Sequence, residues 1–477
     1  MLFNSFEYFL FLPLVVLAYF ISPVRYRVWL LLLASYGFYM FWRWEYIVLI
    51  IAQTEINYYA GLQIAKSSDP RKRRFWLVVA LVLTLAILFF FKYFNFANNT
   101  LRWIFQSFQA GYSIPNLNVL LPVGISFHTF QALSYTIDLW RGKIPVERNF
   151  SRFALFVTFF PLLVAGPIER AHRLLPEFAE EKHFDVERTV SGLKMILWGL
   201  FKKVVIADRL AEYVRQVYGH PGSHSGSTLL LATYFFAFQI YCDFSGYSDI
   251  AIGSARILGY DLMQNFNLPY LAKSISDFWQ RWHISLSTWF RDYVYIPLGG
   301  NRGTNYKWAF NIFVTFLISG LWHGANWTFI VWGGLHGFYY LIERGISPFA
   351  RRCVKYFCLP GRLVSAIKIL LTFHLVLIAW VFFRAASLRD AIFILTRIAT
   401  NLTGRLYLGS STVSTTFGAA FIFLIGIVMI LQYREKVSLY FSEVRVPALL
   451  RTCAYLGLLL GLAMFGKSSN DFIYFQF

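Results

Sequence analysis

The sequence predicts an all-α polytopic membrane protein, with about eleven transmembrane helices and a few re-entrant or interfacial helices. Hydrophobic residues make up 57% of the 477-residue chain and charged residues 14%, against about 45–50% and 25% in ordinary soluble proteins. The window from Phe75 to Phe91 contains no charged residue, and it continues through Lys92 to Phe96. A stretch of this length can cross a hydrocarbon core of roughly 30 Å.

The formal charge of +20 raises the alternative of nucleic-acid binding. The basic residues, however, gather in short clusters between apolar runs, such as Arg71 to Arg74, Arg141 to Arg152 and Arg351 to Lys355. This distribution is typical of the cytoplasmic loops of membrane proteins. We therefore expect the lipid bilayer as a partner and no nucleic acid.

The four cysteines are Cys242, Cys353, Cys358 and Cys453, and they form no CxxC pair. Cys353 and Cys358 lie in a basic loop that we expect in the cytoplasm, where disulfides are rare. The sequence also contains no HExxH motif, no GxSxG elbow and no P-loop. We therefore expect no disulfide, no metal site and no permanently bound cofactor.

The N-terminal part of the chain contains five expected spans, at about 6–22, 26–42, 44–65, 75–97 and 119–140. No basic region precedes the first apolar run, so it is predicted to be a retained span and not a cleaved signal peptide. If the N-terminus lies outside, the odd-numbered loops carry eleven lysines and arginines and the even-numbered loops two. This asymmetry favours an outer N-terminus and cytoplasmic odd-numbered loops.

The next segments are less regular. The apolar run 153–168 contains Pro161 and ends at Gly166-Pro167. Such breaks occur at membrane depth only where protein or a polar cavity covers the freed backbone groups. Residues 191–210 combine an apolar face with basic side chains, which is typical of an interfacial helix; these are Lys194, Lys202, Lys203 and Arg209. Residues 228–244 form a further expected span, which runs into a polar stretch from Asp243 to Asp249.

Residues 274–291 are too polar for a lipid-facing span and too apolar for a free loop. On a helix, Phe278, Trp282 and Trp289 share one stripe, and the polar side chains take the other faces. The polar set is Asp277, Arg281, His283 and Ser287. The pattern predicts one tilted or re-entrant helix that lines a polar interior.

His323 lies between Trp322 and Gly324, at the break between two apolar runs, 309–322 and 327–341. Basic residues at the far ends of both runs place those ends in the cytoplasm. From Trp308 to His323 is 15 residues, or about 23 Å of helix, which is less than the core of roughly 30 Å. His323 is therefore expected within the membrane, in its outer half.

Three more spans are expected at about 363–384, 414–433 and 446–466, followed by an aromatic tail at 467–477. Basic residues between the last two spans place that loop inside and the C-terminus outside. We divide the chain, as a single membrane domain, into N-terminal helices 1–140, a catalytic core 141–345, C-terminal helices 346–466 and the tail. The tail has two interpretations, an interfacial anchor or a hook that folds back into a cavity.

His323 also has two interpretations, a hydrogen-bonded core histidine or a general base. Burial disfavours the imidazolium, so a neutral His323 could accept a proton from a hydroxyl and promote acyl transfer. His283 could be a second polar group beside it, or an interfacial histidine. His336 follows His323 by 13 residues, so helical spacing alone does not bring it to the same site. His128 and His374 lie in apolar runs and are interpreted as packing residues.

Several motifs, in this order, resemble the membrane-bound O-acyltransferase family and its bacterial alginate O-acetyltransferase branch. The resemblance covers nearly the whole chain, and the motifs are 1–5 (MLFNS), 122–127 (PVGISF), 241–249 (YCDFSGYSD), 277–283 (DFWQRWH), 322–324 (WHG) and 472–477 (FIYFQF). Each motif is weak alone, and their order makes the resemblance specific.

The resemblance implies a ring of helices around a thinned centre, where funnels from both faces meet near the essential histidine, His323. His283 would take the second polar position, and the candidates for lining the funnel are Asp277, Arg281, Trp322 and Asn326. In relatives that add D-alanine to teichoic acid, a separate small protein carries a tail like this one. Its tyrosine is proposed to hold the acyl group, which makes Tyr474 the candidate carrier here.

The resemblance further implies an acetyltransferase in the bacterial inner membrane, with both termini on the periplasmic side. Acetyl-CoA in the cytoplasm is the expected donor, and an outer SGNH-type O-acetyltransferase with the polysaccharide synthesis machinery is the expected partner. The fused tail favours acetylation of a polysaccharide such as alginate. The alternatives are peptidoglycan, cellulose or teichoic acid as the acceptor, or a transporter without covalent chemistry, for which we find no paired broken repeats.

Overall fold

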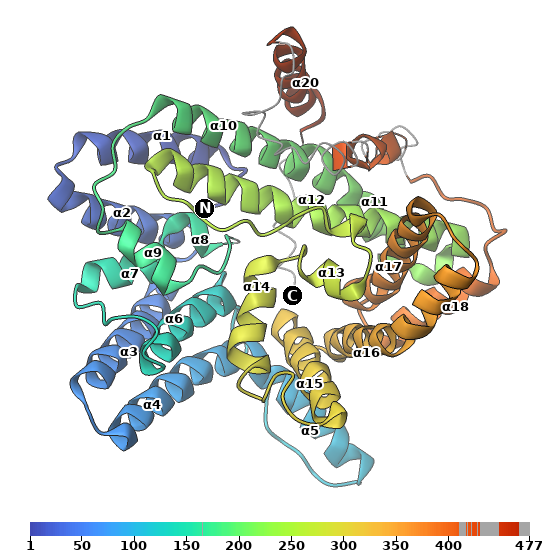
Figure 1. The fold of residues 1–477 in the computed structure, drawn as a ribbon, viewed down its shortest axis with the longest axis horizontal. Coiled ribbons are helices and arrows are strands. Elements are labelled where there is room, and N and C mark those ends of the chain that lie inside the picture. Colours follow the sequence, from blue (N-terminus) through green and yellow to red (C-terminus); the bar gives the residue numbers. More distant parts are fainter. Residues whose placement is uncertain are drawn as a thin grey trace. The chain divides into compact units, whose positions relative to one another are not determined.

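The structure is a computed structural model, and it describes residues 1–164, 166–409, 416, 418–420, 422–426, 428–429 and 448–466. Within these residues every regular element is a helix (Figure 1). The predicted fold class, an all-α polytopic membrane protein, is confirmed. The chain forms two compact units, one of residues 1–196 and 250–263 and the other of residues 197–249 and 264–477.

The first unit contains the N-terminal helices. They are α1 (Phe6–Ile21), α2 (Val24–Met40), η1 (Trp44–Tyr46), α3 (Ile47–Lys66), α4 (Pro70–Leu88), η2 (Phe89–Tyr93), α5 (Phe94–Ser107), α6 (Ile125–Trp140), α7 (Phe150–Thr158), α8 (Phe160–Leu163) and α9 (Ala171–Glu177). α10 (Val186–Leu200) and α12 (Gly226–Leu258) contribute residues to both units.

The second unit contains the elements around His323. They are η3 (Phe201–Ala207), α11 (Asp208–Gly219), η4 (Pro221–Ser223), η5 (Pro269–Leu271), α13 (Ile275–Trp279), α14 (Ile284–Phe290), η6 (Arg291–Tyr295), α15 (Asn305–His323), α16 (Trp327–Tyr356), α17 (Gly361–Arg384), α18 (Leu388–Thr400) and α20 (Ala448–Phe465).

Three helical stretches of the described chain are long and apolar enough to cross a membrane, namely 70–107, 226–258 and 361–384. The first begins where the Asp69 carboxylate accepts a hydrogen bond from the Arg71 amide and Pro70 takes the first helical turn, a favourable N-terminus. Helices α1 and 452–465 are apolar but shorter. The count of about eleven crossings therefore stays a prediction.

Two expected elements begin or end elsewhere. The span expected from residue 119 begins as α6 at Ile125, because Gly124 adopts a left-handed φ of 72° that breaks the helix before it. The run 153–168 is divided into α7 and α8. The last expected span matches α20, whereas the span at 414–433 falls largely outside the described residues, and the tail 467–477 with Tyr474 falls entirely outside them.

The prediction of one helix over residues 274–291 is wrong. The segment is divided into α13 and α14, because His283 has a φ of 44°, a conformation that no α-helix accommodates. The aromatic stripe is nevertheless buried, with Phe278 1%, Trp282 0% and Trp289 5% exposed. The side chains of the stripe are therefore enclosed by the fold, although the backbone bends sharply in its middle.

The interpretation of residues 191–210 as an interfacial helix is wrong for two of its lysines. The side chains of Lys202 and Lys203 are only 5% and 1% exposed, and each forms salt bridges with aspartates of the second unit. Apolar and basic residues alternate here because the basic groups have buried partners, and not because they face water.

Candidate active site

His323 is the last residue of α15, and a tight hairpin connects it to α16. Asn326 begins α16 by accepting a hydrogen bond from the Thr328 amide at 3.1 Å, which is the usual role of an N-cap. The two helices approach closely where Gly320 faces Gly333, since a Cβ on Gly320 would lie 3.2 Å from the Gly333 Cα and would overlap the Phe329 carbonyl. The glycines around the predicted break therefore allow the hairpin to close.

The imidazole of His323 is buried among aromatic rings, with 2% of the residue exposed. Its ring centroid lies 5.0 Å from that of Trp322, 4.9 Å from Trp332 on α16 and 5.5 Å from Phe383 on α17. Aromatic side chains from α15, α16 and α17 therefore enclose this imidazole.

His283 is held at the break between α13 and α14. Its Nδ1 lies 3.1 Å from the Oδ1 of Asn265, and this acceptor requires the proton of the neutral ring to be on Nδ1. Asn265 is itself positioned by Ser248 of α12, at 3.3 Å, and by the Ser285 hydroxyl, at 2.9 Å. The contact with Asn265 therefore fixes the orientation and the tautomer of the His283 ring.

The Trp322 indole connects the two predicted site histidines. It lies 5.0 Å from the His323 ring and 6.2 Å from the His283 ring, measured between centroids. The structure thus brings His283 and His323 to one indole, although 40 residues separate them in the sequence.

The other three candidates for lining the funnel, Asp277, Arg281 and Asn326, form hydrogen bonds or ion pairs that stabilise the local backbone. Arg281 Nε and Asp277 Oδ1 lie 2.5 Å apart, and the second Asp277 oxygen accepts the Lys273 amide at 2.9 Å. Asn326 caps α16. Asp277 and Arg281 therefore support the turn that carries His283, and neither lines the cavity described below.

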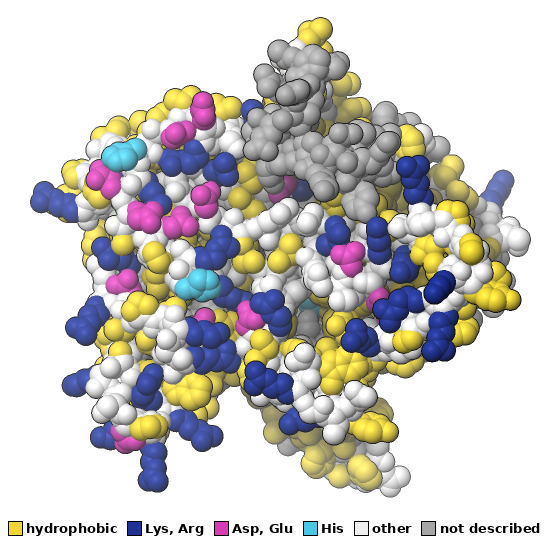
Figure 2. All heavy atoms as spheres, viewed as in Figure 1, with side chains coloured by type: hydrophobic (Ala, Val, Ile, Leu, Met, Phe, Trp, Pro, Cys, Tyr) yellow, Lys and Arg dark blue, Asp and Glu magenta, His cyan; other side chains and the backbone are white. Residues whose placement is uncertain are grey.

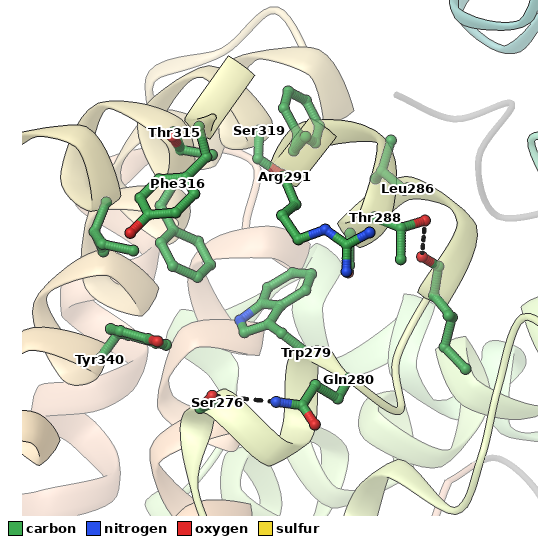
Figure 3. A pocket seen from close by; sticks show the side chains of 15 residues that line it. Ser276, Trp279, Gln280, Leu286, Thr288, Arg291, Thr315, Phe316, Ser319 and Tyr340 are labelled. Carbon is green, nitrogen blue, oxygen red and sulfur yellow. Dashed lines mark hydrogen bonds between the residues drawn. The ribbon is translucent and has the colours of Figure 1, made fainter. Parts of the chain in front are cut away.

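A cavity of about 350 Å³ lies within the second unit, between α13, α14, η6, α15 and α16 (Figure 3). Its lining is mainly apolar and aromatic, and the serine and threonine hydroxyl groups in it belong to Ser276, Ser287, Thr288, Thr315 and Ser319. Ser319 lies one helical turn before His323 on α15. The cavity therefore reaches to within one turn of the buried histidine.

Arg291 is the cationic residue of the cavity lining. Its side chain is 60% exposed and its Nε lies 2.8 Å from the Asp292 carboxylate, a contact that raises the pKa of Arg291. The exposed guanidinium could therefore meet an anionic part of a ligand whose apolar part enters the cavity.

Sequence reasoning missed several residues of this site. Asn265 and the hydroxyl groups of the cavity carry no local motif, and only the fold brings them together. His336 is 0% exposed on α16. Its ring centroid lies 4.9 Å from that of Trp332, one helical turn earlier, and the same indole contacts His323. Among the described residues, no three His, Cys, Asp or Glu side chains form a group that could hold a metal ion.

Comparisons with known proteins agree with this architecture. The sequence model described as the membrane-bound O-acyltransferase family matches residues 143–387. A probable alginate O-acetylase, AlgI, of Pseudomonas aeruginosa is 44% identical over 384 residues, which cover 80% of this chain and 72% of the relative. The corresponding protein of Azotobacter vinelandii is 43% identical over 381 residues, covering 80% and 74%.

Relatives whose names give another polymer as the acyl acceptor are also similar to this chain. A peptidoglycan O-acetyltransferase of Helicobacter pylori is 36% identical over 419 residues, which cover 81% of this chain and 77% of the relative. A teichoic acid D-alanyltransferase of Bacillus subtilis is 30% identical over 289 residues, covering 57% and 71%. The chain is therefore an acyltransferase that belongs to the membrane-bound O-acyltransferase family.

Proposed function

We propose that this acyltransferase moves acetyl groups from cytoplasmic acetyl-CoA across the bacterial inner membrane, for O-acetylation of an extracellular or periplasmic polysaccharide. One observation carries the proposal: a cavity of about 350 Å³ is lined by Ser319, which lies one helical turn before the buried His323. This volume is within the range of about 300–1,000 Å³ that is common for small-molecule sites. The pantetheine arm would lie in the apolar cavity, and Arg291 would meet the phosphates.

The transfer step uses His323 as the general base. Its neutral imidazole takes the proton of the attacking hydroxyl as the oxygen adds to the thioester carbonyl, so a C–O bond forms and the C–S bond breaks. The proton then passes to the departing CoA thiolate, which leaves as the thiol. His283, beside the same indole, would help to orient the donor. General-base assistance contributes about 10²–10⁴ to the rate.

The basic surface supports a cytoplasmic entrance for the donor. Arg302 and Lys307 lie between η6 and the first turn of α15, and both are exposed. Lysine and arginine side chains are also prominent on the face shown in Figure 2. Since basic loops remain in the cytoplasm, both termini would then lie on the periplasmic side.

The tail supplies the proposed acceptor on the outer side. Tyr474 belongs to an aromatic sequence that lies outside the described residues, and it would carry the acetyl ester on its phenolic oxygen. A partner of the SGNH type would remove the acetyl group and pass it to the polymer. Alginate is the polymer that we favour, because the probable alginate O-acetylases are 41–44% identical to this chain and the peptidoglycan enzyme 36%.

The experiment compares the wild-type protein with His323→Ala and Tyr474→Phe in cells that depend on this gene for polysaccharide acetylation. We expect His323→Ala to lower the acetyl content of the polymer at least 100-fold. Tyr474→Phe should abolish acetylation of the polymer, because it keeps the ring and removes the hydroxyl. Membrane abundance of each variant is measured by immunoblot.

Three results would contradict parts of the proposal. Normal acetylation by His323→Ala at normal abundance would exclude the general base, and this is the result expected of a transporter without covalent chemistry. Normal acetylation by Tyr474→Phe would leave the tail as an interfacial anchor. Acetyl groups found on peptidoglycan or cellulose and not on alginate would change the acceptor and keep the chemistry.

A further inference from the structure

His336 is a buried histidine that the acetyl transfer described above does not use. It is 0% exposed on α16, and its Nδ1 accepts a hydrogen bond from the indole Nε1 of Trp279 at 3.3 Å. Because Nδ1 is the acceptor, the proton of the neutral ring is on Nε2. For the Nε2 atom, no hydrogen-bond partner is found among the described residues. Among the described residues, the hydrogen bond from Trp279 is therefore the polar contact that holds this imidazole.

Trp279 contacts both the cavity and the rings around His323. Its indole lines the cavity, and in Figure 3 it lies in the middle of the lining side chains. It also contacts the Trp332 indole, with ring centroids 5.7 Å apart, and Trp332 lies 4.9 Å from the His323 imidazole. A displacement of Trp279 would therefore change both the inner wall of the cavity and the packing against His323.

The position of Trp279 depends on anchors outside its own helix. α13 has five residues, and so short a helix has little stability by itself. Its first amide, of Ile275, donates to the Glu343 carboxylate at 2.8 Å, and its last residue, Trp279, donates to His336. Glu343 and His336 are seven residues apart on α16 and lie on the same helix face.

We infer that His336 is a positioning residue for acyl transfer. It holds the Trp279 indole in the wall of the cavity, so that the donor carbonyl is presented to His323 in one orientation. His336 touches neither the donor nor the reacting atoms. The inference rests on the proposed function, because it assumes that the cavity holds the acyl donor.

The test measures acetyl-CoA turnover by the purified protein in proteoliposomes, with a tyrosine-containing tail peptide or the whole chain as the acceptor. His336→Leu removes the acceptor atom, and His336→Asn returns an oxygen at the place of Nδ1. Trp279→Phe removes the donor and keeps an aromatic ring. His374→Leu is the matched control, because this exposed histidine of α17 is hydrogen-bonded to an aromatic side chain, Tyr234, at 2.7 Å.

We expect His336→Leu to lower kcat about fivefold to tenfold, as the loss of one orienting hydrogen bond would, with a smaller change in KM. His336→Asn should recover most of this loss, and His374→Leu should match the wild type. The double variant of His336→Leu and Trp279→Phe should be no slower than the slower single variant, since both changes remove the same bond.

The inference is overturned if His336→Leu turns over at the wild-type rate, if Leu and Asn lower kcat equally, or if the two single effects multiply in the double variant. Failure of the proposed function would give a different result in the same assay. In that case the wild-type protein consumes no acetyl-CoA, or His323→Ala consumes it at the wild-type rate.

Discussion

At the scale of single residues, Lys203 shows how this protein keeps charge in its interior. Its ammonium group lies 2.8 Å from both the Asp208 and the Asp243 carboxylates, and its side chain is 1% exposed. Gly246 permits this arrangement, because a Cβ there would lie 2.7 Å from the Gly199 carbonyl and 3.2 Å from the Lys203 amide. The close approach of α12 to η3 thus brings the aspartate to the lysine.

Removal of the Lys203 charge should therefore destabilise the protein strongly. Lys203→Met keeps most of the side-chain volume and leaves two buried carboxylates without their cation, which costs about 3–5 kcal/mol in comparable cases. Thermal and denaturant unfolding of the detergent-purified protein would measure the loss. Lys307→Met is the control, because exposed Lys307 should change the free energy of unfolding by less than about 0.5 kcal/mol. Equal unfolding midpoints for the two variants would contradict the importance of the buried network.

At the scale of the elements, the close packing of α15 against α16 predicts that a larger residue at Gly320 destabilises the hairpin. Gly320→Ala places a Cβ against the Phe329 carbonyl and the Gly333 Cα, so the helices must separate and the ring contacts of His323 loosen. We expect a loss of about 1–3 kcal/mol in stability, as for other overpacked sites, together with reduced acetyl transfer.

The control for the hairpin is Gly345→Ala. Gly345 lies in α16, the second helix of the hairpin, and a Cβ there meets nothing within 4 Å. Alanine favours the helix by about 1 kcal/mol over glycine, so this variant should keep or raise the unfolding midpoint. If both variants unfolded alike, close helix packing at Gly320 would not be the cause.

Elements that depend on local composition could be predicted from the sequence, and elements that depend on partners distant in the sequence could not. Apolar runs predicted helices such as α1, α17 and α20 within a few residues, because the apolar composition of each run is a local property of the sequence. The division of residues 274–291 was missed, since the φ of 44° at His283 is stabilised by Asn265, a partner distant in sequence. The buried state of Lys203 was missed for the same reason.

At the scale of the whole molecule, the residues of the candidate site differ in how readily the sequence alone identifies them. His323 was found because an ionisable residue at an apolar break is expensive in a membrane, and the structure buries it. His283 was proposed because it lies on the polar side of the expected re-entrant helix, and the family motif supported it. The structure places it beside the same indole. His336 was set aside because 13 residues separate it from His323. How near the His336 and His323 rings lie depends on how the α15–α16 hairpin packs. Residue spacing along a single helix does not describe that packing.

The orientation of the whole chain in the membrane gives the last prediction. Cys358 is exposed in a basic loop that charge counting places in the cytoplasm, whereas exposed Ser113 lies in the fourth loop, which the same counting places outside. In a background that lacks the exposed Cys453, a membrane-impermeant maleimide should label Cys358 in inside-out vesicles and not in spheroplasts. Ser113→Cys, in a background without Cys358, should show the opposite pattern. Labelling of both positions from the same side would contradict the proposed orientation, and with it the entry of the acyl donor from the cytoplasm.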